Sequence, residues 1–231
     1  MKLLNIAQIK HALFKKATIF QTGGYRPTEE LGESWIGKVV WEKEGETIPS
    51  NFDPICTMFL YNLPYVPKEL TSYQLLTLYM DFDVFNNLDR DDLVSFFKIN
   101  CYTELDELQK VNKQSKKIKP FPLTPVFINN DAPAWEDSDS ITPAIENEIL
   151  RLEFEEDIEY YDDIVEKIYA THKIGGYPSF TQSGVSFGEE YPFIFQISSD
   201  EKARFNIIDS GSFYFFYNPE KGDWIVYCDF Y

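Results

Sequence analysis

A degenerate internal repeat constrains this chain more than any other feature of its sequence. Each copy holds, in the same order, a Gly-Gly-Tyr turn, a proline-led aromatic strand, a polar connection and a second aromatic strand. The segments of the first copy are 23–27, 54–61 and 75–82, and those of the second are 175–178, 192–197 and 212–217. Three blocks in one order predict an internal duplication, and therefore two similar halves.

The spacing between the blocks differs between the two copies. Tyr25 precedes Pro54 by 54 − 25 = 29 residues, whereas Tyr177 precedes Pro192 by only 192 − 177 = 15. The repeat therefore requires an insertion in the first copy, which we place around residues 35–49.

The aromatic segments have the composition of β-strands. The chain contains 20 Phe and 15 Tyr, which favour a pleated, half-buried surface. Residues 193–197 and 213–217 are almost continuously apolar, as in strands that are buried on both faces or lie at the centre of a sheet.

The region between the copies is predicted element by element. Residues 93–103 read as a further strand, and 104–111 as a short helical turn. The prolines of 120–125 indicate an extended connector because proline fixes φ and lacks a backbone donor. Residues 126–128 then form a short edge strand.

Residues 142–169 have the periodicity of an amphipathic helix. Thr142 is placed to cap it, Pro143 suits its first position, and Gly175-Gly176 are suited to end it. A change of phase near residues 154–157 indicates two helices or a kink. We expect these helices to pack on the sheet.

These elements predict an α+β fold: one β-rich domain over residues 1–231, internally duplicated, with acidic helices on the sheet system. The predicted pseudo-repeats span approximately 18–104 and 171–231, and the connector with the acidic helices spans 105–170.

Charge is concentrated in one part of the chain. There are 38 acidic and 21 basic residues, a net charge of −17, and residues 131–166 contribute 14 acidic side chains against one arginine. So acidic a chain is unsuited to binding a phosphate backbone, and no apolar run is long enough to cross a bilayer. The acidic segment is either a solvated face or a dock for a basic partner. The candidate partner face comprises Glu153, Glu155, Glu156, Asp157, Glu159, Asp162 and Asp163.

The cysteines and histidines predict no catalytic or metal site. Three cysteines without a C-x-x-C spacing disfavour disulfides and zinc ribbons, and a reducing, cytoplasmic setting fits best. Each cysteine is expected to be a small buried apolar residue in a strand. We expect no cofactor, and no motif identifies a nucleophile.

We therefore expect a non-catalytic binding protein, of which an immunity-like or antitoxin-like protein against a basic partner is one form. The alternative is an enzyme with an unrecognised site near the Gly-Gly-Tyr turns; a peptide-binding module with an exposed sheet edge is also open. Candidate binding residues are Gly23, Gly24, Tyr25, His172, Gly175, Gly176, Tyr177, Gln182 and Gln196.

The segment 172–182, the strand 193–197 and the strand 211–216 together resemble the signature of the YwqG-like family of uncharacterised bacterial proteins. The turn at 23–27 is similar to the earlier Gly-Gly-x-Pro turn of that family. The first strand lacks a counterpart of Gln196, and the Trp-Gly-Asp segment often seen in the family is replaced by residues 205–210. The resemblance implies a duplicated, β-rich α+β domain in a bacterial cytoplasm and brings no catalytic residues.

Overall fold

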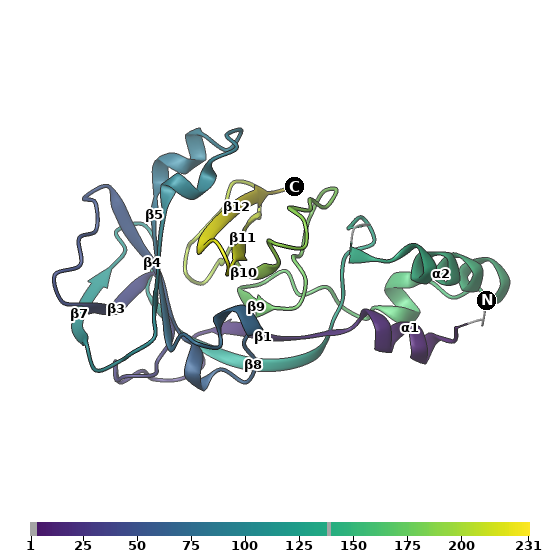
Figure 1. The fold of residues 1–231 in the computed structure, drawn as a ribbon, viewed down its shortest axis with the longest axis horizontal. Coiled ribbons are helices and arrows are strands. Elements are labelled where there is room, and N and C mark those ends of the chain that lie inside the picture. Colours follow the sequence, from purple (N-terminus) through teal and green to yellow (C-terminus); the bar gives the residue numbers. More distant parts are fainter. Residues whose placement is uncertain (1–3, 138–139) are drawn as a thin grey trace.

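Ten strands pair into one antiparallel sheet in the order β12-β11-β10-β9-β1-β8-β2-β4-β5-β6 (Figure 1). The computed structural model describes residues 4–137 and 140–231. The strands of the sheet are β1 (Lys15–Thr22), β2 (Trp35–Ile36), β4 (Phe52–Phe59), β5 (Leu75–Asp81), β6 (Phe97–Tyr102), β8 (Phe121–Asp131), β9 (Lys173–Gly175), β10 (Phe193–Ser198), β11 (Ser212–Asn218) and β12 (Asp223–Asp229). A separate two-stranded ribbon pairs β3 (Lys38–Lys43) with β7 (Leu108–Gln114).

The β1–β8 pair lies at the centre and divides the sheet into two half-sheets. We call β8-β2-β4-β5-β6 the first half-sheet and β1-β9-β10-β11-β12 the second. The two are interlocked, because β2 pairs with β8, far along the chain, while β9 pairs with β1. Both half-sheets have the same order of strands outward from the centre.

The sheet curls into a half-barrel, and the main hydrophobic core fills its inside (Figure 1). Aromatic rings from the two half-sheets meet there. Phe97 of β6 lies edge-on to Phe213 and Phe215 of β11, with ring centroids 5.0 and 5.3 Å apart. The core therefore joins the two half-sheets across the curl into one domain.

Each half-sheet also has an outer face with its own small apolar cluster. The β3–β7 ribbon covers that of the first half-sheet, where Trp41 and Leu108 pack on Phe59 and Leu75. The irregular segment 176–192 covers that of the second, where Phe180 and Phe187 pack near Tyr214 and Phe216.

The helices form a lobe beyond the ends of β1 and β8 (Figure 1). This helical lobe contains α1 (Ile6–Leu13), α2 (Pro143–Glu156) and a π-helical turn (Tyr160–Ile164). Its core is separate from that of the sheet and includes Ile9, Ile149 and Ile164. The expectation that the helices pack on the sheet is therefore corrected: their apolar stripes face one another.

The helix boundaries match the predicted pattern only in part. Pro143 is the first residue of α2 and Thr142 is its N-cap, although the Thr142 side chain makes no capping hydrogen bond. The predicted change of phase is confirmed, because Asp157 adopts a left-handed conformation and ends α2. Gly175-Gly176 do not end a helix; Gly175 lies in β9.

Two predictions between the copies are wrong. Residues 108–114 form β7 rather than part of a helical turn, because they pair with β3. Residues 120–128 largely belong to β8, a central strand rather than a connector and an edge. The backbone N of Leu123 points toward the β2 side of β8 and donates to Ser34 O (2.8 Å). The N of Pro125, two residues later, points to the same side, but the pairing with β2 does not extend that far. A proline is therefore tolerated there, because no backbone donor is required.

No helix within the described part of the chain is long and apolar enough to cross a membrane.

Candidate functional site

The second Gly-Gly-Tyr turn is held by a buried ion pair. Lys173 Nζ in β9 donates to both carboxylate oxygens of Asp131, at 3.0 and 2.9 Å, and Tyr177 N donates to Asp131 Oδ2 at 2.7 Å. Burial lowers the pKa of Lys173, and the charge of Asp131 opposes that effect. Gly176 has φ +72°, and a Cβ there would overlap the Asp131 carboxylate, so this position requires glycine.

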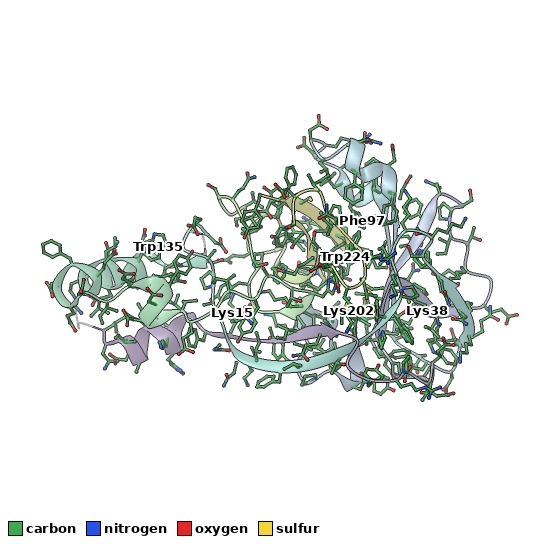
Figure 2. The ribbon with its side chains drawn as sticks, turned by 180° about the vertical axis from the view of Figure 1, so that it is seen from behind. Lys15, Lys38, Phe97, Trp135, Lys202 and Trp224 are labelled. Atoms are coloured by element: carbon green, nitrogen blue, oxygen red, sulfur yellow. The ribbon has the colours of Figure 1, made fainter. Side chains whose placement is uncertain are left out.

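Tyr177 connects this turn to the start of β1. Its hydroxyl donates to Leu13 O (2.8 Å), and the ammonium of Lys15 lies 3.8 Å from the centre of its ring. Lys15 lies on the segment by which the helical lobe joins the sheet (Figure 2). The turn therefore places an aromatic face and a cation together.

A cavity of about 210 Å³ opens beside this turn, and we call it the aromatic pocket. Segment 176–193 forms much of its wall, and the polar side chains at its edge are Lys15, Asp137 and Ser140. The aromatic residues that line it are Tyr177, Phe180, Phe187, Tyr191, Phe193 and Phe216. Lys15 is exposed as a residue, but partial desolvation of its ammonium lowers its pKa, while the charges of Asp137 and Asp131 oppose the effect.

His172 lies nearby but is fully engaged by the fold. Its Nδ1 accepts a hydrogen bond from Ser198 N (3.1 Å), and its Nε2 lies 3.2 Å from Asp200 Oδ2. Burial acts to raise the pKa of Asp200, but hydrogen bonds from His172 and Thr22 outweigh it and hold that pKa below the usual range. Because both ring nitrogens are bonded, His172 serves here as a link between β9 and β10.

The two candidate glutamines also bond within the fold. Gln196 Oε1 accepts from Ser179 N (3.0 Å), and Gln196 Nε2 donates to Thr171 O and to two serine hydroxyls. Gln182 Nε2 donates to Phe230 O (2.8 Å). These contacts tie segment 176–182 to β10 and to the end of the chain.

The first Gly-Gly-Tyr turn lies elsewhere. Gly23 and Gly24 follow β1, whereas Gly175 pairs with Ala17 near the opposite end of that strand. Gly23 lies against Lys202, and Tyr25 is exposed. The described lining of the aromatic pocket does not include Gly23, Gly24 or Tyr25.

The acidic candidates share the surface of the helical lobe, and all seven are exposed. Arg151 binds Glu155 (2.8 Å) and Glu156 (3.4 Å), and it also binds the buried Glu148 (3.1 Å). A hydrogen bond with Asp162, reinforced by neighbouring negative charge, raises the pKa of Glu159. Among residues 4–137 and 140–231, the other five of the seven carboxylates form no ion pair, and all face solvent.

Two apolar side chains interrupt this acidic surface. Phe154 is 92% exposed and Leu150 is 45% exposed. They are four residues apart on α2 and therefore share one face of the helix. We call these two side chains and the seven carboxylates the acidic face.

The remaining polar groups point to structural roles. Burial raises the pKa of the Cys101 and Cys228 thiols to about 12 and that of Cys56 further, which keeps them protonated. Among residues 4–137 and 140–231, no group of three His, Cys, Asp or Glu side chains is arranged to hold a metal ion.

Sequence reasoning missed three polar residues of this region: Lys15, Asp131 and Asp137. Asp131 and Asp137 were counted only as part of the acidic run, although both are buried. The one available signal was the position of Asp131 shortly after the apolar residues 126–128, where a carboxylate can accept backbone hydrogen bonds.

A family model described as "Domain of unknown function (DUF1963)" matches residues 62–222. The chain belongs to this family. The DUF1963 match begins after β4 and ends in the turn between β11 and β12, so it includes the second Gly-Gly-Tyr turn, α2 and every lining residue of the aromatic pocket except Lys15. A search of curated proteins finds no match.

Proposed function

We propose that this protein is a non-catalytic binding protein that docks a basic protein partner on its acidic face. The observation that carries the proposal is the exposure of Phe154 among carboxylates on a lobe that projects from the sheet (Figure 1). A Phe side chain exposed to this extent leaves a large apolar area in water, which binding would remove.

Charge complementarity favours a basic partner over a neutral one. Residues 131–166 contribute −13 of the net −17, because they hold 14 acidic residues and one basic residue. Asp131, Asp137 and Glu148 of this segment are buried, but the seven carboxylates of the acidic face are exposed. An exposed face of this charge accelerates association with a basic protein and disfavours acidic ones, while a central aromatic residue supplies affinity. An immunity-like or antitoxin-like protein is one biological form of this function.

We further propose that the two half-sheets derive from a duplicated unit, as in the YwqG-like proteins that the sequence resembles. The register of the outer strands supports this relation. Cys101 of β6 lies opposite Leu76 of β5, and Cys228 of β12 lies opposite Phe213 of β11. The alignment is better anchored at Gly37 than at Gly23, because 54 − 37 and 192 − 175 are both 17 residues. With this anchor, the first copy needs no insertion before Pro54.

The experiment is affinity capture from a lysate of the source organism at low salt, followed by calorimetry with the captured protein once purified. The lobe variant replaces Glu153, Glu156, Asp162 and Asp163 with the corresponding amides. Its matched control neutralises four exposed acids elsewhere, namely Asp89, Asp91, Glu201 and Glu220. Phe154→Ser tests the apolar contact separately.

We expect a basic protein to bind the wild type and the control variant equally. The lobe variant should bind it about tenfold or more weakly, and added salt should weaken wild-type binding. The proposal is wrong if affinity for the captured protein is unchanged in the lobe variant, or if it does not respond to ionic strength.

A further inference from the structure

We propose that the aromatic pocket is a binding site for a small planar aromatic carboxylate, with the ring held between aromatic side chains and the carboxylate held by Lys15. This site is separate from the acidic face. It lies where the start of β1 meets segment 176–193, rather than on the surface of α2.

The walls favour a flat ring over an aliphatic chain. Phe216 lies edge-on to both Phe187 and Phe193, with ring centroids 4.9 and 5.8 Å apart. The rings of Phe180 and Tyr214 lie 4.8 Å apart beneath them. Aromatic rings attract one another in edge-to-face and offset arrangements, so an entering ring would extend a network that already exists.

The polar edge favours an anion. No carboxylate of a described residue forms an ion pair with Lys15, whose ammonium instead lies over the ring of Tyr177 at 3.8 Å. Lys173, the other lysine close to Tyr177, is already paired with Asp131. Lys15 is therefore the cation available at the pocket mouth, where it is exposed to an approaching anion.

Asp137 restricts where the negative group of the ligand can lie. It is buried at the pocket edge and accepts a hydrogen bond from Ser140 Oγ (2.6 Å). A second carboxylate at that edge would be repelled by Asp137. The geometry thus selects a single carboxylate at the mouth, beside Lys15, with the ring directed against the aromatic walls of the pocket.

The probe is 2-naphthoate, measured by isothermal titration calorimetry against the full chain, with 2-naphthalenemethanol as its uncharged analogue. Lys15→Met removes the cation and keeps an apolar stem. Lys16→Met is the matched control, because successive residues of a strand point to opposite faces and Lys16 does not line the pocket. Ser186→Trp places a large side chain at the exposed rim and tests the cavity independently of charge.

We expect saturable binding of 2-naphthoate to the wild type and to Lys16→Met, and binding about tenfold weaker to Lys15→Met and to the alcohol. Ser186→Trp should also bind weakly, with an unchanged melting temperature. The proposal is overturned if the wild type shows no saturable binding at millimolar concentrations, or if Lys15→Met binds as well as Lys16→Met. The lobe variant should bind 2-naphthoate normally, so failure of the docking proposal is distinguishable from failure of this one.

Discussion

The outer faces of the two half-sheets are covered in different ways. On the first, the β3–β7 ribbon pairs its own backbone, and its Glu42 accepts hydrogen bonds from Tyr79 of the sheet and from Lys113 (2.7 Å). On the second, segment 176–192 has no partner strand. It depends on side chains of the sheet, such as Tyr214, whose hydroxyl donates to Ser179 O (2.7 Å).

This difference explains where the aromatic pocket lies. An irregular segment must be fastened at separate points, because its backbone groups need individual partners. The aromatic pocket lies along this irregular cover, whose residues 185–188 and 191–192 contribute to its lining.

The largest difference is expected between the buried lysines of the two half-sheets. Lys173 and Asp131 are 1% and 0% exposed, whereas Lys38 pairs with Glu29, which is 35% exposed. Asp131→Asn leaves a buried cation unpaired and should reduce the free energy of unfolding by about 3–5 kcal/mol. Glu29→Gln should reduce it by less, about 1 kcal/mol, because solvent already screens the partly exposed Glu29 carboxylate, and the buried Lys38 ammonium still lies over the ring of Trp35 at 4.6 Å.

Urea unfolding of the two variants and the wild type measures this difference. If both variants lose the same free energy of unfolding, the prediction is contradicted. The buried Lys173–Asp131 pair would then stabilise the protein no more than the partly exposed Lys38–Glu29 pair does.

A smaller effect is expected in the pH dependence of stability. The pKa of Asp200, on the second half-sheet, is lowered, so its contribution is present above the ordinary aspartate pKa and is lost as the pH falls through the lowered value. The pKa of Glu42, on the ribbon, is raised by burial, so stability instead decreases as the pH rises through that raised value. Each contribution should be about 1 kcal/mol or less after solvent screening.

Melting temperatures measured from acid to neutral pH test these opposite signs. Asp200→Asn should reduce the loss of stability on acidification, and Glu42→Gln should reduce the loss on approach to neutrality. If both variants alter the profile in the same direction, the assigned environments of the two carboxylates are wrong.

The smallest difference is expected in thiol reactivity. Cys101 lies on β6 and Cys228 on β12, the outermost strands of the two half-sheets, and burial raises the pKa of each to about 12. Both should react with iodoacetamide far more slowly than a free thiol at neutral pH, and Cys101, which is less buried, should react first. Mass spectrometry of native and urea-unfolded protein provides the rates; rapid native labelling of Cys228 would contradict this placement.

The strands richest in aromatic residues were predictable from the sequence. The runs at 54–61, 75–82, 193–197 and 213–217 lie largely within β4, β5, β10 and β11, because their composition suits strands buried by neighbours. The prediction of β8 was wrong because its prolines were interpreted without knowing how short β2 is. That length is a tertiary fact, which no local pattern contains.

The candidate site was predictable only in its outline. The second Gly-Gly-Tyr turn lies at the aromatic pocket, but the first turn, at Gly23, follows the opposite end of β1 and does not line that pocket. Lys15 lies about 160 residues from the turn it contacts, so sequence proximity gave no sign of it. The exposure of Phe154 was likewise hidden within the helical periodicity.

The interlocked arrangement at the centre of the sheet determines when this chain can fold during synthesis. Ala17 of β1 pairs with Ile128 on one side and with Gly175 on the other. A ribosome must therefore complete β9 before β1 is enclosed, and until then β1 has an unpaired edge. Pairings so distant in sequence fold slowly, and the nascent N-terminal region would expose an aggregation-prone strand for most of translation. Sheet formation would thus follow rather than accompany synthesis of most of the chain.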